Sequence, residues 1–361
     1  MSVPAKDNSP FKLMAQFGHQ KLVFCNDESV GLQAIIAIHD TTLGPAIGGV
    51  RMLPYQTTDE ALDDVLRLSR GMTYKAAVAG VNLGGGNAVI IGDHRTQKKE
   101  VLLRRFGQFV AQLNGAFIAS LDIGTTPKDM ECLRMETQHV AGLPKPLGGN
   151  GDSAPFTAKG VYYGIKAALK ELYGSDSLAG RTVAVQGAGN VGEQLIALLR
   201  EENAKVYVSD IAEERMVEVA NRYKAVAVSN NNIYELDVDV YAPCALGGTV
   251  NKDTISKMRC RIIAGSANNQ LRKEQEDGKL LVEKKILYAP DYVINAGGLI
   301  SCYAEIAGYG ASHTAALTEN IYEATRSVLR KSLTEKVASI QAADAIAESR
   351  IADMRKIRSF K

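Results

Sequence analysis

The stretch of residues 183–210 constrains the fold more than any other part of the chain. An apolar run enters a turn in which Gly187, Gly189 and Gly192 have the spacing G-x-G-x-x-G, a helical pattern follows, and a second short strand ends at Asp210. In such a β-α-β unit the first glycine allows a tight turn, the second lets a pyrophosphate approach the backbone, and the third packs helix against strand. The stretch predicts a doubly wound α/β sheet with a dinucleotide site. The alternative is a tight turn without a ligand.

The residues around this turn favour NAD over NADP. The helix begins at Asn190 and Val191, where free N–H groups and a partial positive charge would face the phosphates. Asp210 follows Gly187 by 23 residues, close to where a carboxylate accepts a hydrogen bond from the adenosine ribose 2′-hydroxyl. Residues 211 and 212 are not basic, so nothing there would attract a 2′-phosphate.

The length of the chain predicts two domains. At 361 residues it exceeds the size at which a single hydrophobic core usually divides. Residues 142–155 are rich in Gly, Pro, Asn and Ser and are the best candidate for a hinge. We expect an α/β domain in residues 1–145 and a doubly wound, Rossmann-type domain in residues 146–337. A C-terminal helix in residues 338–361 is expected to return to the first domain.

Charge and cysteine content favour a small-molecule partner. Lys and Arg number 42 against 40 Asp and Glu, a balance that provides no long-range field for nucleic acid or an anionic membrane. The five cysteines include no C-x-x-C pair, which argues against both disulfides and a zinc site, so we expect no metal. No apolar run approaches membrane-spanning length, and the N-terminus lacks a signal pattern. We expect a cytoplasmic protein.

Local patterns predict the elements of the first domain. Alternating β-branched residues predict strands at 21–26, 31–39 and 46–53. Thr58 is expected to cap a helix that ends near Lys75. The cluster of Gly84, Gly85 and Gly86 is expected to break the chain before a strand at Ala88. The order Thr-Pro-Lys-Asp at 126–129 resembles a capping box.

Three stretches of the second domain combine glycine, asparagine and small residues at predicted strand ends: 241–248, 265–270 and 295–298. Residues 292–295 themselves read as a strand. Ligands of open α/β sheets bind outside the carboxyl ends of the strands, so these stretches would line the cofactor, with Ala242, Cys244, Ala245 and Asn268 as contacts. Ordinary turn chemistry is the alternative.

Several segments taken together resemble a known family. In chain order they are TTLGPAIGGVRM, LRLSRGMTYKAA, GGGNAVIIGD, LDIGTT, VQGAGNVG, YAPCALGG, IIAGSANNQL and YAPDYVINAGGLI. They look like the leucine, phenylalanine and tryptophan dehydrogenase branch of the amino-acid dehydrogenases. The short stretches RMLPY, LSRGMTYKAA and ALGG resemble the tryptophan dehydrogenases most closely.

The resemblance implies an activity and an assembly. The activity is reversible, NAD-dependent oxidative deamination of a hydrophobic or aromatic L-amino acid to a 2-oxo acid and ammonia. The first domain would then bind the substrate and form the contacts of a homo-oligomer, and the second would bind NAD.

The resemblance also assigns roles to individual residues. Lys75 matches the lysine that holds the substrate carboxylate, a charge-assisted pairing that an ammonium makes well. Asp122 matches the aspartate that handles the amino-group proton. Further matches concern the pocket and the nicotinamide: Gly48 and Gly49, whose backbone lets the substrate side chain in; Ile47 and Met72, which form part of an apolar pocket; Asn268, near substrate and nicotinamide; and Thr157, a contact to the nicotinamide amide.

Asn87 departs from the family pattern. The resemblance places a second lysine directly after the glycine cluster, where it activates the hydrolytic water, whereas this chain has Asn87. An asparagine can form hydrogen bonds but cannot take a proton, and loss of a general base typically costs about 10²- to 10⁴-fold. Three interpretations remain: an impaired or altered dehydrogenase, an imine-reducing or condensing enzyme on the same scaffold, and a catalytically silent NAD-binding protein.

Overall fold

A computed structural model describes residues 9–358, which form two compact units. Within that range the first unit holds residues 9–152, 305–308 and 350–358, and the second holds 153–304 and 309–349. The chain therefore leaves the first unit inside the glycine-rich stretch that the sequence singled out as a hinge. The functional division at 145/146 and 337/338 stays a prediction.

The first unit is built on a five-stranded mixed sheet with the order β1-β2-β4-β3-β5. Strand β2 is antiparallel to β1 and β4, whereas β3 is parallel to β4 and β5. Its strands are β1 (Lys21–Asp27), β2 (Leu32–Asp40), β3 (Ala46–Leu53), β4 (Gly84–Ile91) and β5 (Phe117–Leu121). Its helices are α1 (Pro10–Phe17), α2 (Thr58–Val78), α3 (Glu100–Ala111) and α4 (Pro127–Arg134), with a 3₁₀ turn η1 (Lys145–Leu147).

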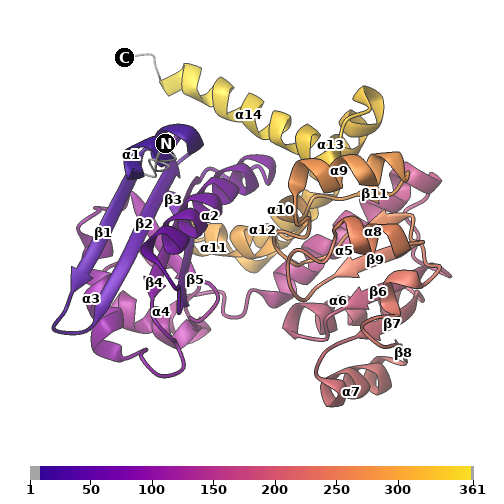
Figure 1. The fold of residues 1–361 in the computed structure, drawn as a ribbon, viewed down its shortest axis with the longest axis horizontal. Coiled ribbons are helices and arrows are strands. Elements are labelled where there is room, and N and C mark those ends of the chain that lie inside the picture. The colour runs from indigo at the N-terminus through magenta and orange to yellow at the C-terminus, as the bar shows by residue number, and fades with distance from the viewer. Residues whose placement is uncertain (1–8, 359–361) are drawn as a thin grey trace, which may run out of the picture. The chain divides into compact units, whose positions relative to one another are not determined.

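Helix α2 covers one face of this sheet (Figure 1). Its cap is Thr57 rather than Thr58, because the Thr57 side chain accepts a hydrogen bond from the N–H of Glu60. The helix also runs to Val78, beyond the end expected near Lys75. The residues that face the sheet are buried against β2 and β4 and follow the helical repeat: Ala61, Leu62, Val65 and Leu66.

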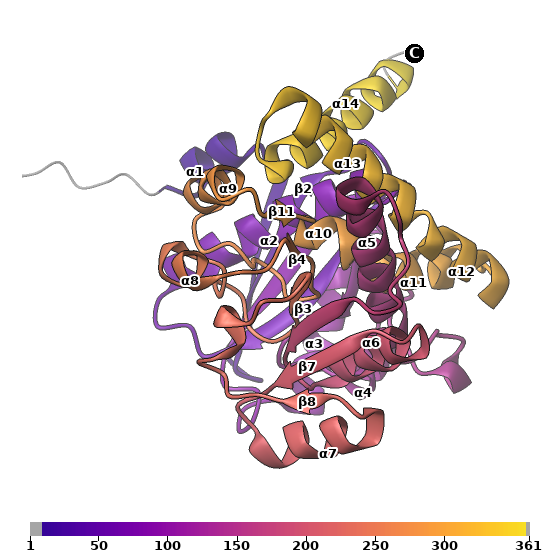
Figure 2. The same cartoon turned by 90° about the vertical axis from the view of Figure 1, so that its right-hand side faces the viewer.

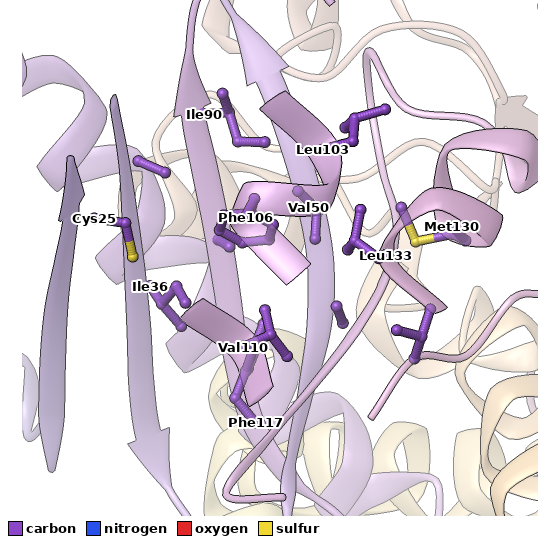
Figure 3. Packing of buried hydrophobic residues seen from close by; sticks show 14 of the residues in the cluster. Cys25, Ile36, Val50, Ile90, Leu103, Phe106, Val110, Phe117, Met130 and Leu133 are labelled. Carbon is purple, nitrogen blue, oxygen red and sulfur yellow. The ribbon is translucent and has the colours of Figure 1, made fainter. Parts of the chain in front are cut away.

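Helices α3 and α4 cover the opposite face. Phe106 and Val110 of α3, and Met130 and Leu133 of α4, are fully buried among the strand residues of that face (Figure 3). The predicted capping box at 126–129 is confirmed: the Thr126 and Asp129 side chains each accept a hydrogen bond from the other residue's N–H group.

The glycine cluster lies inside strand β4 and does not precede it, so the expected chain break was wrong. A Cβ atom on Gly85 would lie 2.1 Å from Oγ1 of Thr73 on α2, and one on Gly86 would lie 2.8 Å from the Phe117 ring. These glycines therefore let α2 and the Phe117 ring of β5 approach β4 closely, and this packing outweighs the low strand propensity of glycine.

The second unit contains a six-stranded parallel sheet with the order β11-β10-β9-β6-β7-β8. Read from the other edge, this is the strand order 3-2-1-4-5-6 of a dinucleotide-binding fold. The strands are β6 (Thr182–Gln186), β7 (Lys205–Ser209), β8 (Val226–Ala227), β9 (Val240–Pro243), β10 (Ile262–Ile263) and β11 (Leu287–Tyr288). The predicted fold class, α/β with a doubly wound sheet, is confirmed.

The helices that begin in the second unit are α5 (Ala154–Tyr173), α6 (Asn190–Glu201), α7 (Glu213–Tyr223), α8 (Lys252–Lys257), α9 (Glu274–Glu283), α10 (Asp291–Ile294), α11 (Gly297–Ala307), α12 (Ala311–Glu319), α13 (Ile321–Glu335) and α14 (Ser339–Arg358), with a 3₁₀ turn η2 (Ile233–Glu235). Helix α7 follows β7 and lies beside β8 (Figure 2). Residues 292–295 were expected to form a strand, but they lie at a helical turn that starts after Pro290.

Helix α14 ends in the first unit, as expected. There Arg350 donates to the carbonyl oxygens of Ala76 and Ala77 at the end of α2, and Arg355 pairs with Asp40 at 2.7 Å. In residues 9–358 no helix combines the length and the apolar character that a membrane span needs.

Two glycines of the first unit are expected to respond in opposite ways to alanine. A Cβ atom on Gly48 would lie 1.7 Å from the carbonyl oxygen of Gly86, so Gly48→Ala must push β3 and β4 apart and should cost about 1–3 kcal/mol or more. Gly71, inside α2, has no atom within 4 Å of that position, so Gly71→Ala should stabilise by about 1 kcal/mol. Thermal unfolding of the two variants checks this; a Gly48→Ala protein as stable as the parent contradicts the packing.

Candidate functional site

In the first unit, three predicted residues lie together: Asn87 of β4, Gly49 of β3 and Asp122, which directly follows β5. In the register that pairs Val50 with Ala88, Gly49 of β3 lies beside Asn87 of β4. Gly49 is also opposite Ser120 of β5, two residues before Asp122. Side chains alternate along a strand, so Asn87, Gly49 and Asp122 share the face that α2 covers. The structure thus brings together three of the predicted residues.

Gly49 makes room for the Asp122 side chain. A Cβ atom on Gly49 would lie 2.4 Å from Cβ of Asp122 and 3.0 Å from its carboxyl carbon. The space beside Gly48 is filled by the backbone of Gly86 and Asn87. Both glycines therefore admit protein atoms at these positions. Ile47 precedes them and is buried.

The Asp122 carboxylate is held by two partners. The guanidinium of Arg51 donates to both of its oxygens, from Nε at 3.2 Å and from Nη2 at 3.4 Å, and the N–H of Ile123 donates to Oδ1 at 2.7 Å. The Asp122 side chain is 19% exposed, so it is desolvated on the protein side and still accessible. A carboxylate held in this way can accept a hydrogen bond from a bound amine.

Lys75 and Met72 lie on one flank of α2, because residues three apart on a helix share a side. Both are half-buried. The contact between Thr73 and Gly85 fixes this part of α2 against β4, the strand that carries Asn87. Lys75 therefore belongs to the same unit as Asp122.

Asn87 is 2% exposed in the middle of β4. Its side-chain nitrogen lies 3.5 Å from the carbonyl oxygen of Ala88, at the limit of hydrogen-bond range. This contact of the amide nitrogen is therefore a weak one. The amide contributes no titrating group.

In the second unit, the predicted cofactor residues gather at the glycine-rich turn between β6 and α6. Gly187 has φ 111°, and a Cβ atom there would lie 2.8 Å from the backbone of Cys244, so only glycine fits without strain. A Cβ atom on Gly192 would lie 2.0 Å from the carbonyl oxygen of Gly187. Gly189 is exposed and has no atom within 4 Å of that position. The three glycines therefore provide the tight turn, the close packing and the open backbone that a pyrophosphate requires.

Helix α6 begins directly at this turn, with Asn190 exposed and Val191 half-buried. Its first N–H groups are available to an anion. Asp210, one residue beyond β7, accepts a hydrogen bond from the N–H of Ala188 at 2.7 Å and from that of Ala212 at 2.8 Å. The two bonds orient the carboxylate beside the turn.

The carboxyl end of β9 lies against the turn. The N–H of Cys244 donates to the carbonyl oxygen of Gln186 at 2.7 Å, which places Cys244 and Ala245 beside Gly187; Ala242 is buried in the strand. This is where the strand order reverses, the usual place for a ligand in such sheets. Burial raises the pKa of the Cys244 thiol, so it is a neutral contact rather than a nucleophile.

Asn268 and Thr157 are the remaining predicted residues of the second unit. Asn268 is exposed, and its Oδ1 accepts a hydrogen bond at 2.8 Å from Nδ2 of Asn295. Thr157, near the start of α5, is half-buried, and its hydroxyl donates to the carbonyl oxygen of Ser153 at 3.1 Å. A Cβ atom on Gly298 would lie 3.1 Å from that hydroxyl oxygen. Thr157 therefore packs beside the start of α11, the helix that follows Asn295.

Two residues that contact predicted site residues were missed by the sequence analysis. Arg51 supports Asp122, and the signal for it was a charged side chain within the apolar strand 46–53. Asn295 supports Asn268; it lay in a stretch expected to line the cofactor but was given no role.

Comparisons with known proteins agree with this geometry. Residues 19–139 match the family described as Glu/Leu/Phe/Val dehydrogenase, dimerisation domain. Residues 148–212 and 207–359 match the Glutamate/Leucine/Phenylalanine/Valine dehydrogenase family.

Individual relatives cover almost the whole chain. A leucine dehydrogenase of Geobacillus stearothermophilus is 49% identical over 97% of this chain and 95% of its own. A phenylalanine dehydrogenase of Thermoactinomyces intermedius is 46% identical over 96% and 95%. The crystal structure of L-tryptophan dehydrogenase from Nostoc punctiforme matches with a TM-score of 0.84 and 45% identity over 96% of this chain and 99% of its own.

The predicted resemblance is confirmed by these matches, which extend through both units and through every stretch that carries a site residue. The chain belongs to the glutamate, leucine, phenylalanine and valine dehydrogenase family of NAD(P)-dependent amino-acid dehydrogenases.

Proposed function

We propose that this protein is an NAD-dependent dehydrogenase of hydrophobic or aromatic L-amino acids. The observation that carries the proposal is the Asp122 carboxylate, which lies over Gly49 in one unit while the other unit holds an open glycine-rich turn for a dinucleotide. Relatives named leucine, phenylalanine and tryptophan dehydrogenase support the choice of substrate class.

Each of the predicted residues would have its own role in the reaction. Lys75 would hold the substrate carboxylate by a charge-assisted hydrogen bond. Asp122, ionised and oriented, would accept the proton of the substrate ammonium, and Asn268 would hold the substrate near the nicotinamide. When bound, the nicotinamide accepts the hydride from Cα. Asn87 would bind the water that adds to the imine, without activating it.

Asp210 supports NAD over NADP. Its carboxylate is fixed by two backbone N–H groups and retains lone pairs for ribose hydroxyls. The exposed Gly189 and the first N–H groups of α6 fit a pyrophosphate. The residues at this turn therefore fit the dinucleotide that the family uses.

The match of residues 19–139 to a dimerisation domain supports a homo-oligomer. The five cysteines are free thiols, which fits the expected cytoplasmic location because thiols stay reduced there.

Asn87 favours a second candidate. If imine hydrolysis is blocked, the same hydride geometry serves an enzyme that reduces or condenses imines, which needs no activated water. A catalytically silent NAD-binding protein is the third possibility.

The central experiment compares the parent with Asn87→Lys over a panel of hydrophobic and aromatic L-amino acids. Restoring a titratable group beside Gly49 should raise kcat for NADH production by about tenfold or more, with a smaller change in KM and a new limb in the pH profile. Equal rates would show that hydrolysis uses another base. If neither form produces NADH while both bind it, the imine-reducing or silent interpretation replaces the proposal.

Cofactor choice is tested separately by titration. NADP(H) should bind about tenfold or more weakly than NAD(H), because its 2′-phosphate would meet the Asp210 carboxylate. NADH and NADPH fluorescence measures both dissociation constants, and equal values would refute the role of Asp210.

The open backbone at Gly189 gives a variant that affects binding alone. Gly189 has φ −71° and open space, so alanine fits the fold, but its methyl group would occupy the approach of the pyrophosphate. Gly189→Ala should keep the parent's melting temperature and weaken NADH binding by about tenfold or more. Gly310→Ala is the matched control, since Gly310 also precedes a helix and faces open space. Unchanged NADH affinity in Gly189→Ala would place the pyrophosphate elsewhere.

A further inference from the structure

Arg51 lies at the centre of a charged cluster that the proposed reaction leaves unexplained. Its guanidinium is 11% exposed on strand β3, with Asp122 on one side and Asp64 of α2 on the other. Nη1 of Arg51 lies 3.3 and 3.1 Å from the two oxygens of Asp64. The hydroxyl of Tyr55 donates to Oδ2 of Asp64 at 2.5 Å.

The cluster uses one cation for two carboxylates. Burial alone would lower the pKa of Arg51, but Asp122 and Asp64 outweigh it and the pKa is raised, so the guanidinium stays charged. Burial and the contact with Asp64 raise the pKa of Tyr55, which therefore remains a donor. Because Asp64 shares the guanidinium, it limits how strongly Arg51 engages Asp122.

The bond pattern also fixes the direction of the Asp122 carboxylate. Arg51 donates from Nε and Nη2 to different oxygens, and Ile123 donates to Oδ1. A point charge such as a lysine ammonium could not bind both oxygens in this planar way. The lone pairs that remain on the carboxylate are those available to a substrate.

Other ionisable groups on the packed elements are Lys75 of α2, His94 beside Gly124, and Lys98. Lys98 is occupied, since its ammonium pairs with Asp129 at 2.7 Å and donates to the carbonyl oxygen of Gly124. Arg51 is in direct contact with Asp122.

We propose that Arg51 is a positioning residue for Asp122, which binds both oxygens of that carboxylate and aims it at the substrate amine, and that Asp64, held by Tyr55, moderates its effect. This inference rests on the proposed function, because it assigns the amine proton to Asp122.

The test uses opposite charge changes in the full-length protein, both in the parent and with Asn87→Lys. Activity needs the ionised carboxylate, so the acid limb of the kcat/KM profile reports its protonation. Arg51→Gln should move that limb up by about one pH unit, because a cation is lost. Asp64→Asn should move it down by roughly half a unit, because Arg51 then serves Asp122 alone. Arg51→Lys should keep the limb near its place yet lower kcat, since charge is retained and orientation is lost.

Matched controls separate positioning from folding. Arg95→Gln removes an arginine that pairs with Asp93 at the surface of the same unit and should leave the limb unmoved. NADH titration and thermal unfolding show whether each variant is folded.

A readout without turnover keeps the two proposals apart. In protein labelled with ¹³C at aspartate carboxyl carbons, the Asp122 signal is identified by its loss in Asp122→Asn, and its titration should move in the same opposite directions in Arg51→Gln and Asp64→Asn. If no form of the protein turns over amino acids yet these shifts appear, the dehydrogenase proposal fails and the effect of Arg51 on Asp122 stands. If the signal and the acid limb stay in place in folded Arg51→Gln, Arg51 has a packing role only.

Discussion

The close approach of strand β3 to β4 at Gly48 is the contact on which the surroundings of Asp122 depend. Because Gly48 has no side chain, its backbone can lie against that of Gly86 and Asn87, and Gly49 comes to lie beside Asn87. A third glycine, Gly85, lets α2 rest directly on β4 at Thr73. Helix, strands and the Asp122 carboxylate thereby pack closely together. This close packing fixes the position of the polar side chains.

Glycines also shape the turn between β6 and α6 in the second unit, where one of them serves a ligand and not the packing. At the turn between β6 and α6, Gly187 and Gly192 permit contacts between backbone segments, whereas Gly189 leaves backbone open to solvent. The two kinds of glycine look identical in the sequence. The structure distinguishes them by the atoms that an added methyl group would contact. Gly187 and Gly192 are required by the fold, whereas Gly189 is available to a ligand.

Short-range signals predicted much of this molecule, and long-range contacts explain the errors. The turn at 187–192 and the cap at Thr126 depend on neighbouring residues, so the sequence sufficed. The glycines of β4 were read as a chain break because their partners on α2 and β5 are invisible in a local window. The Arg51 cluster was missed for the same reason: its carboxylates lie 13 and 71 residues away. Asp122 was found through family resemblance rather than through its geometry.

The open space at Gly189 has a consequence for how this protein can fail. Cells remove defective chains mainly by recognising unfolded states, and a change that leaves folding intact escapes that surveillance. A chain altered at Gly189 would therefore persist at normal abundance, because a protease would not distinguish it from the unaltered protein. In a homo-oligomer the altered chain would also assemble with unaltered chains. One subunit that does not bind the dinucleotide would then be part of an assembly whose other subunits do.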